Sequence, residues 1–302
     1  MSDHLSDMIA FVRIADTGSL SAAAAELDQS LPVVSRRLTR LEERLGVRLV
    51  NRTTRQLSLT DEGVAFHMRC SRILTDIEEA EAEVSKDQGT AVGLLRITTS
   101  FAFSRRKLAG LLRTFESNHP GLRIHLDGSD RIVNLVDEGF DIAIRFGAMQ
   151  DSSLIARAIA PNAHVMCASP TYLDKRGRPT TIEELALHDC ILHGSPPASR
   201  WTFENGKSVK VGGDLTTNDG DLAHIWALEG AGIVMKSIWD VAEDVHSGNL
   251  EIVMPKTRPP ATPVSAVFPH SRLAAARVRL VIDFLTKQLR AEWEHKIAHL
   301  LT

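Results

Sequence analysis

Seven arginines are concentrated near the N-terminus, between Leu31 and Thr60. That stretch contains no lysine and two acids, Glu42 and Glu43, so its formal charge is +5; the whole chain of 302 residues carries −3, and the remainder therefore −8. A guanidinium group grips phosphate oxygens and can pair bidentately with a guanine edge. A basic segment attached to an acidic body therefore indicates a module that binds DNA.

A predicted helix that follows Ser30 must position these arginines. Ser30 can cap the helix, Pro32 is tolerated in its first turn, and Gly46 can end it. At about 100° per residue, an apolar stripe forms beside the basic face, made of Val34, Leu38, Leu41 and Leu45. The predicted DNA contacts on this helix and the hairpin after it are Ser30, Val33, Ser35, Arg36, Arg37, Arg40, Arg52 and Arg55. The alternative is a solvated basic helix beside a surface hairpin.

Two helices and a hairpin complete the N-terminal module. Apolar residues at helical spacing over 5–15 predict a first helix, and small residues over 22–27 predict a second that approaches its neighbours closely. Residues 47–50 and 56–59 read as two short strands. This order predicts a helix-turn-helix followed by a wing, with the arginine helix in the major groove.

A long helix is predicted next, because residues 61–86 contain no proline and only one glycine, Gly63. Six residues along it are spaced alternately by four and three, as in the seam of a coiled coil. They are the predicted dimerisation residues Phe66, Cys70, Ile73, Ile77, Ala80 and Val84. The alternative is that this stripe packs against its own domain.

Beyond residue 88, strand and helix patterns alternate. Strands are predicted over 94–99, 123–126 and 141–145, with helices over 108–116 and 132–138 between them. A second alternating set begins near residue 164, and the last strand and helix return to the first set. This order predicts two α/β lobes with mainly parallel sheets.

Ligands of open α/β sheets bind beyond the carboxyl ends of strands, where helix N-termini offer free N–H groups. Hydroxyl, amide, guanidinium and aromatic groups follow the predicted strands of both lobes and suit a small organic anion. The predicted effector residues are Thr99, Ser100, Phe101, Ala102, Phe103, Ser129, Arg145, Phe146, Gly147, His193, Thr217 and Asn218. The alternative for each is a structural cap or core packing, and Arg145 could be salt-bridged inside its lobe.

Other patterns do not assemble into catalytic or metal chemistry. Ser104 and Lys107 fit S-x-x-K, but the companion S-D-N and K-T-G patterns are missing. The three scattered cysteines lack metal-ligand spacing, so we expect no metal, no cofactor and no catalytic residues. The start of the chain lacks a basic region before its short apolar stretch, and no apolar run approaches a membrane span. The expected setting is the reducing cytoplasm.

Residues 11–63 resemble the winged helix-turn-helix of LysR-type transcriptional regulators. The matching residues are Thr17–Ser19, Ala22–Ala24, Leu27, Pro32, Val34–Arg36, Leu41–Glu42, Leu45–Leu49, Arg52–Thr53 and Leu59–Gly63. Leu31 departs from the pattern, because the family often has at this place a glutamine that can touch DNA. The body is similar to the effector-binding half of the same family, through Glu138–Arg145, Ser169–Leu173, Gly177–Pro179 and His188–Cys190.

The resemblance implies a winged helix-turn-helix over residues 1–60, a linker and dimerisation helix over 61–88, and a periplasmic-binding-protein-like α/β domain over 89–302. Lobe I would comprise 91–161 and 266–302, and lobe II 162–265. The implied partners are double-stranded DNA with an interrupted palindrome, a small-molecule effector, RNA polymerase and a second copy of the chain, as a homodimer or a homotetramer built as a dimer of dimers. Two rivals are a solute-binding protein of the transport kind, which the missing secretory signal opposes, and a two-lobed enzyme, which the missing catalytic set opposes.

Overall fold

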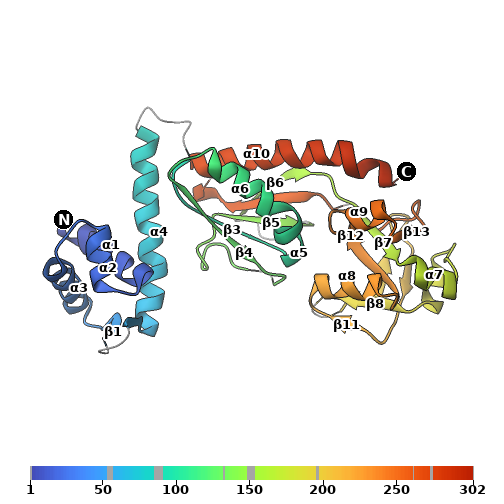
Figure 1. Ribbon diagram of the computed structural model, residues 1–302, viewed down its shortest axis with the longest axis horizontal. Helices are drawn as coiled ribbons and strands as arrows, with labels where there is room; N and C mark the ends of the chain where they lie inside the picture. Colours follow the sequence, from blue (N-terminus) through green and yellow to red (C-terminus); the bar gives the residue numbers. More distant parts are fainter. Residues whose placement is uncertain are drawn as a thin grey trace. The chain divides into compact units, whose positions relative to one another are not determined.

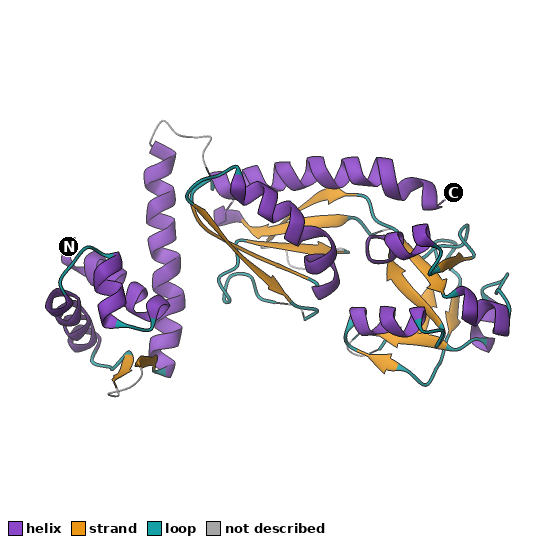
Figure 2. Ribbon diagram, in the orientation of Figure 1, coloured by secondary structure: helices purple, strands orange, loops and turns teal. Residues whose placement is uncertain are grey.

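The computed structural model describes residues 2–52, 57–84, 91–131, 133–147, 154–194, 197–260, 262–272 and 275–301. The chain forms two compact units, an N-terminal one that comprises Met1–Gln88 together with Asp137–Gly139 and a C-terminal one that comprises Gly89–Val136 and Phe140–Thr302. Figure 2 shows that the first unit is helical apart from a small hairpin, whereas the second is mixed α/β. No helix in the described ranges is long and apolar enough to cross a membrane.

Three helices and a hairpin pack against the first half of a long helix in the N-terminal unit (Figure 1). The elements are α1 (Ser2–Thr17), α2 (Leu20–Glu26), α3 (Leu31–Leu45), the antiparallel strands β1 (Val50–Arg52) and β2 (Leu57–Leu59), and α4 (Asp61–Val84). Ser19 caps α2 by accepting from the Ala22 N–H, and Gly46 ends α3 with a left-handed φ of 72°. The core of the unit contains the predicted stripe residues Val34, Leu38 and Leu41, all fully buried.

Two sequence predictions for this unit were wrong in detail. Leu45 lies at the exposed end of α3 instead of continuing the buried stripe. The first strand begins at Val50 rather than at residue 47, because the chain leaves Gly46 in a left-handed turn before it can pair with β2. Ser30 occupies the N-cap position of α3, although its side chain makes no capping hydrogen bond.

The first half of α4 packs within its own unit. The Cys70 side chain is fully buried in the N-terminal core, and the Phe66 ring lies 5.5 Å from the Phe11 ring. We therefore correct the assignment of Cys70 to dimerisation, since hydrophobic spacing alone does not distinguish an intramolecular partner from a second chain, whereas Phe66 is half-buried and remains a predicted dimerisation residue. Further along the same face Ile73 is 45% exposed and Ile77 is half-buried. Ala80 and Val84 also lie on α4, but their side chains are outside the described part of the structure.

The first lobe of the C-terminal unit, lobe I, is built on a five-stranded sheet in the order β4-β3-β5-β14-β6. β3 pairs in parallel with β4 and β5, whereas β14 is antiparallel to β5 and β6. The strands are β3 (Gly93–Thr99), β4 (Leu122–Gly128), β5 (Ile142–Phe146), β6 (Leu154–Ala160) and β14 (Val264–Pro269). The helices are α5 (Phe101–Phe103), the π-helical η1 (Ser104–Leu108), α6 (Ala109–Ser117), the 3-10 turn η3 (His270–Arg272), α10 (Ala276–Glu292), the π-helical η4 (Trp293–Ile297) and the 3-10 turn η5 (Ala298–Leu301).

The second lobe, lobe II, contains a five-stranded sheet in the order β11-β8-β12-β7-β13. Its strands are β7 (His164–Ala168), β8 (Cys190–His193), β11 (Thr216–Thr217), β12 (Ile233–Ser237) and β13 (Glu251–Val253), with a separate hairpin of β9 (Arg200–Thr202) and β10 (Ser208–Lys210). The helices are α7 (Pro170–Arg176), the 3-10 turn η2 (Glu183–Leu187), α8 (Gly220–Leu228) and α9 (Ile238–Ser247). The returning strand β14 begins at Val264, two residues before the predicted start of the returning segment.

The predicted helix over 132–138 was also wrong. Residues 133 and 134 are irregular, residues 135–139 form turns, and Ile132 lies outside the described residues. The Asn134 side chain accepts a hydrogen bond from the Val136 N–H at 3.1 Å, a local contact that competes with helical backbone bonding, and Gly139 follows at a φ of 72°. Val133 and Leu135 still bury their side chains, so the apolar pattern is satisfied without a helix.

Two chain crossings connect the lobes. The crossing at Pro161–Ala163 is held by the indole N–H of Trp239, which donates to the Pro161 carbonyl at 2.9 Å. The Asn162 side chain reaches the second crossing by donating to the Thr262 carbonyl at 3.0 Å. A single hydrophobic cluster runs through both lobes and includes Phe103 and Trp239, whose ring centroids are 6.1 Å apart.

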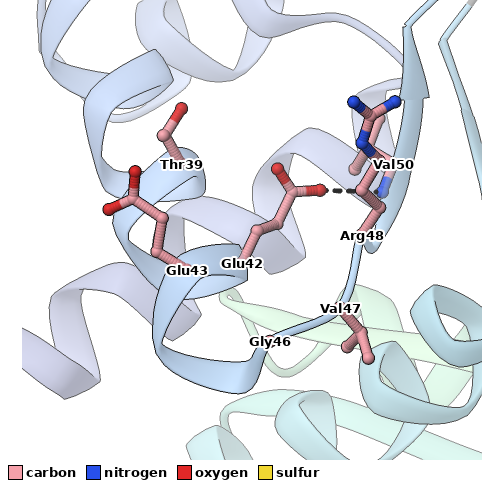
Figure 3. Close-up of a pocket in the computed structure, with 7 residues that line it drawn as sticks. All are labelled: Thr39, Glu42, Glu43, Gly46, Val47, Arg48 and Val50. Atoms are coloured by element: carbon pink, nitrogen blue, oxygen red, sulfur yellow. Dashed lines mark hydrogen bonds between the residues drawn. The ribbon is translucent and has the colours of Figure 1, made fainter.

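Glu42 joins the wing to α3 at the edge of a hollow of about 610 Å³. Its Oε1 accepts hydrogen bonds from the backbone N–H groups of Leu49 at 2.8 Å and Val50 at 3.2 Å. Figure 3 shows the Glu42 carboxylate turned toward the wing, whereas the neighbouring Glu43 side chain points away from it. The wing is thus anchored by one carboxylate of the arginine-bearing helix.

We expect Glu42→Ala to accelerate amide hydrogen exchange at Leu49 and Val50 by about tenfold or more, because two N–H groups lose their charged acceptor. Glu42→Gln retains an acceptor oxygen and should have a smaller effect. Glu43→Ala is the matched control, since this exposed carboxylate points away from the wing. Equal exchange rates in Glu42→Ala and Glu43→Ala would contradict this role of Glu42.

Candidate nucleic-acid interface and ligand site

The N-terminal half of α3 presents an uncovered surface. Arg36 is exposed, and its Nε donates to the Pro32 carbonyl at 3.2 Å, which leans the guanidinium back along the first turn. Leu31, in the same turn, is 45% exposed. A leucine side chain here cannot form a hydrogen bond with a base, but it is suited to an apolar contact with a thymine methyl group in the major groove.

Arg37 and Arg40 face a buried carboxylate that the sequence analysis did not identify. Arg40 donates through Nε to Asp7 Oδ2 at 3.0 Å and through a terminal nitrogen to Oδ1 at 2.5 Å, and an Arg37 nitrogen lies 3.7 Å from Oδ1. The Asp7 side chain is only 1% exposed, whereas that of Arg40 is 47% exposed. A bidentate pair of this kind fixes the angle between α1 and α3. The available signal was an acid four residues before Phe11, on the apolar face of the first helix.

The other predicted DNA contacts are distributed around this centre. Ser30 is exposed at the start of α3, and Val33 and Ser35 are half-buried on it. Arg52 ends β1, although its side chain is outside the described atoms, and Arg55 lies outside the described residues.

The parallel strands β3, β4 and β5 end at one edge of lobe I and bring several predicted effector residues together there. Three of them are buried in packing. The Thr99 hydroxyl donates to the Ile144 carbonyl at 2.9 Å, Ala102 is covered, and the Phe103 ring packs edge-on against Phe146 at 5.1 Å. We therefore correct the expectation that the side chains of Thr99, Ala102 and Phe103 line a ligand site. Ser100, Phe101, Ser129, Phe146 and Gly147 keep partly or largely exposed surface at this edge.

Arg145 is the central cation of this edge. Its guanidinium donates to the Ser129 carbonyl at 2.9 Å and to the Thr98 hydroxyl at 3.2 Å, so it braces the ends of two neighbouring strands. Burial lowers the pKa of Arg145 from its ordinary value, while the carboxylates of Asp130 and Asp127 act in the opposite direction. These two acids offset its charge, so the edge is polar rather than strongly cationic.

Lobe II contributes a row of polar side chains across β11, β8 and β12. Thr217 pairs with His193, and the parallel register of β8 and β12 continues the row to Lys236. His193 Nε2 lies 3.0 Å from the Met235 carbonyl, which only accepts, so the proton resides on Nε2 and Nδ1 is left as an acceptor. Burial, followed by the charge of Lys236, lowers the pKa of His193, so its neutral form is favoured. Asn218 follows the row and is exposed.

Lys236 and Asp240 were missed by the sequence analysis. The Lys236 ammonium is buried, lies 2.8 Å from Asp240 Oδ2 and donates to the Gly220 carbonyl at 3.1 Å. Its position therefore ties the end of β12 to the beginnings of α8 and α9. The available signal was a lysine directly after the apolar run Ile233–Met235, where a strand reaches the edge that carries function in open sheets.

The other side chains that could act as nucleophiles make structural contacts or are buried. The Ser104 hydroxyl donates to the Phe101 carbonyl at 2.7 Å, and Lys107 pairs with Glu292 at 2.6 Å, so the S-x-x-K pattern does not assemble a nucleophile. Burial raises the pKa values of the cysteine thiols, to about 11 for Cys70 and about 12 for Cys167 and Cys190. The described part of the chain contains no cluster of three or more histidine, cysteine or acidic side chains that could hold a metal ion.

Comparisons with known proteins cover both units. A family model described as bacterial regulatory helix-turn-helix protein, lysR family, matches residues 5–64, and one described as LysR substrate binding domain matches residues 88–290. The HTH-type transcriptional regulator DmlR of Escherichia coli strain K12 is 36% identical over 286 residues, which cover 93% of each chain. The regulator CrgA of Neisseria meningitidis serogroup C is 34% identical over 96% of this chain and 98% of its own.

Solved structures show the same architecture. A structure of CrgA from Neisseria meningitidis aligns with a TM-score of 0.61 and 35% identity, over 94% of this chain and 98% of that one. The full-length structure of AphB, a virulence activator of Vibrio cholerae, aligns with a TM-score of 0.56 and 27% identity, over 94% and 98% of the two chains.

Proposed function

Because this chain belongs to the LysR family of transcriptional regulators, we propose that it binds operator DNA through α3 and its wing, and that a small organic anion between the two C-terminal lobes modulates this binding. The family establishes a DNA-binding regulator with an effector-binding domain, rather than an enzyme. The observation that carries the DNA part of the proposal is the uncovered N-terminal half of α3, with Arg36 at its surface and its orientation set by Asp7.

The arginines of α3 are proposed to divide their roles. Arg36 contacts the DNA directly, together with Ser30, Val33 and Ser35 from the same surface. Arg37 and Arg40 orient α3 through Asp7, and the exposed part of Arg40 remains available to a phosphate. Arg52 and Arg55 of the wing add contacts to the DNA backbone.

A homodimer is the proposed DNA-binding form. The seam of α4 continues beyond the N-terminal core through Ile73, which is 45% exposed, and its sequence spacing extends through Ile77 to Ala80 and Val84; an apolar stripe of this spacing is suited to a second α4. A two-fold protein matches an interrupted palindrome, and two dimers could occupy adjacent half-sites as a tetramer. The proposal also includes contact between the DNA-bound protein and RNA polymerase. The proposed setting is the cytoplasm.

Arg36→Ala is expected to weaken binding to a DNA fragment selected by the wild-type protein by about tenfold or more, and to reduce the salt slope of the affinity by about one. The reason is the loss of one guanidinium contact to a phosphate or a base edge. Fluorescence anisotropy over a range of salt concentrations measures both quantities.

Arg44→Ala provides the matched control, since it removes the same charge from the last turn of α3. We expect a change of less than about threefold, as distant charges are largely screened at physiological salt. Equal losses in the two variants would indicate a general electrostatic effect and contradict the proposed recognition surface.

The effector site is proposed to lie where the strand ends of the two lobes carry polar groups. Arg145 and Ser129 come from lobe I, and His193, Thr217 and Asn218 from lobe II; Ser100, Phe101, Phe146 and Gly147 complete the set. Guanidinium and hydroxyl donors suit a carboxylate, while the partly exposed phenylalanine rings suit its apolar body. Binding of this anion would change the balance between lobe arrangements, provided that its affinity for them differs.

A thermal-shift panel of small mono- and dicarboxylic acids against the full chain tests the effector proposal. A binding acid at one hundred times its Kd should stabilise the fold by about 2.7 kcal/mol, whereas the uncharged amide of the same acid should not. Arg145→Gln should abolish the response, because the amide cannot pair with a carboxylate. Stabilisation by acid and amide alike, or an unchanged response in the variant, would refute an anion at this site.

A further inference from the structure

Two consecutive arginines of lobe I grip one carboxylate of lobe II. Arg105 lies 2.8 Å from Asp221 Oδ2, and Arg106 lies 3.1 Å from Asp221 Oδ1, so each oxygen binds a different guanidinium. The Asp221 side chain is 13% exposed. The arginines belong to η1 directly after α5, and Asp221 belongs to the first turn of α8; Figure 1 shows α5 and α8 facing each other across the lobes.

Each side of this contact has a neighbouring group that helps to position it. Asp219 caps α8 and accepts from the Asp221 N–H at 2.8 Å, which fixes the carboxylate at the helix start. The Arg105 guanidinium lies 5.3 Å from the centre of the Phe101 ring. Burial acts to raise the pKa of Asp221, but the hydrogen bond and charge of Arg106, the hydrogen bond of Arg105 and the charge of Lys236 outweigh it and leave the pKa below its ordinary value.

The other contacts between the lobes are ring contacts, hydrogen bonds at the chain crossings, and a hydrogen bond that the Arg258 guanidinium of lobe II donates to the Leu301 carbonyl of lobe I. Phe103 meets Trp239 through their rings, and Lys107 lies 5.8 Å above the Trp239 ring while it pairs with Glu292 of its own lobe. These contacts can persist through small changes in lobe angle, whereas a hydrogen-bonded ion pair is lost within a few ångströms. Among the described residues, the Asp221 contact is the ion pair that joins the two lobes, and it is therefore sensitive to lobe separation.

We propose that Asp221 is a positioning residue whose carboxylate, held between Arg105 and Arg106, forms an ionic latch that maintains the lobe arrangement of this structure. The latch adjoins Phe101 on one lobe and Thr217–Asn218 on the other, so an effector at the proposed site would act beside it. Its role in signalling rests on the proposed function. The latch itself depends on neither effector nor DNA.

Energy transfer between two dyes on the full chain tests the latch. Arg113→Cys and Leu187→Cys place labels on lobes I and II at side chains that are 75% and 76% exposed, and the three native cysteines are buried. An excess of unlabelled chain suppresses transfer between copies. Asp221→Asn should raise the ratio of separated to latched lobes by a factor of about 5–30, and rising salt should shift the wild-type protein in the same direction.

Asp283→Asn is the matched control, because it removes a carboxylate that pairs with Arg157 inside lobe I at 2.9 Å. It should leave the transfer distribution at its wild-type value. Arg106→Asp alone should separate the lobes, and its combination with Asp221→Arg should restore much of the transfer. Restoration distinguishes a specific pair from general damage to the fold.

If Asp221→Asn does not fold, the double variant Arg105→Gln with Arg106→Gln leaves the α8 cap intact and should give the same lobe separation. Unchanged transfer in the folded variants at every salt concentration would overturn the latch, as would failure of the exchanged pair to restore transfer. Neither DNA nor effector is present in this measurement. The thermal-shift panel tests the proposed effector site separately, so a negative result there does not affect the test of the latch.

Discussion

A single buried carboxylate, Asp7, determines how the basic face of α3 can be used. A charge that is 1% exposed must be compensated, and the compensation comes from Arg40 through two hydrogen bonds and from Arg37 at 3.7 Å. The cost of desolvating Asp7 is offset only in one orientation of α3 against α1. The same orientation leaves Arg36 at the surface of the helix, so the proposed DNA-binding surface depends on the contact between α3 and Asp7.

The C-terminal unit contains two further carboxylates that each pair with two arginines. Asp141, buried at the start of β5, accepts from the Arg96 N–H at 2.9 Å and pairs with Arg272 and Arg277, each at 3.2 Å, which ties the returning segment of the chain to lobe I. Asp221 binds two arginines between the lobes. In all three places one acid engages two guanidinium groups, and the rigid fork of arginine makes the geometry specific. The junction between lobes is the more exposed of these contacts, as a movable contact should be.

Local features of the fold were predictable from the sequence because their causes are local. Gly46 ends α3, Ser19 caps α2, and the unbroken helical pattern after Asp61 gives α4. The strands that carry the predicted effector residues also follow from the order of strand and helix patterns along the sequence. The resemblance to a known family then supplied the order of the domains, which the matches to both family models support.

Several contacts were not predictable from the sequence, for physical reasons. Nothing near Arg40 indicates a partner thirty-three positions earlier in the chain, so both Arg37 and Arg40 were assigned to DNA alone. The apolar spacing of Phe66 and Cys70 is the same for an intramolecular core and for a coiled coil. In residues 133–139 the Val136 N–H donates a hydrogen bond to the Asn134 side chain, and turns stand where the apolar pattern suggested a helix. Lys236 was missed because its counter-charge comes from the next helix.

The division of the α3 arginines between structure and DNA is tested most directly by a double-mutant cycle of Asp7→Asn and Arg40→Gln, read as the free energy of unfolding in urea. If the pair orients α3, each single variant should be destabilised, and the double variant should be less destabilised than the sum by about 1–3 kcal/mol. Additivity within about 0.5 kcal/mol would contradict the account, since Arg40 would then be free to serve DNA alone.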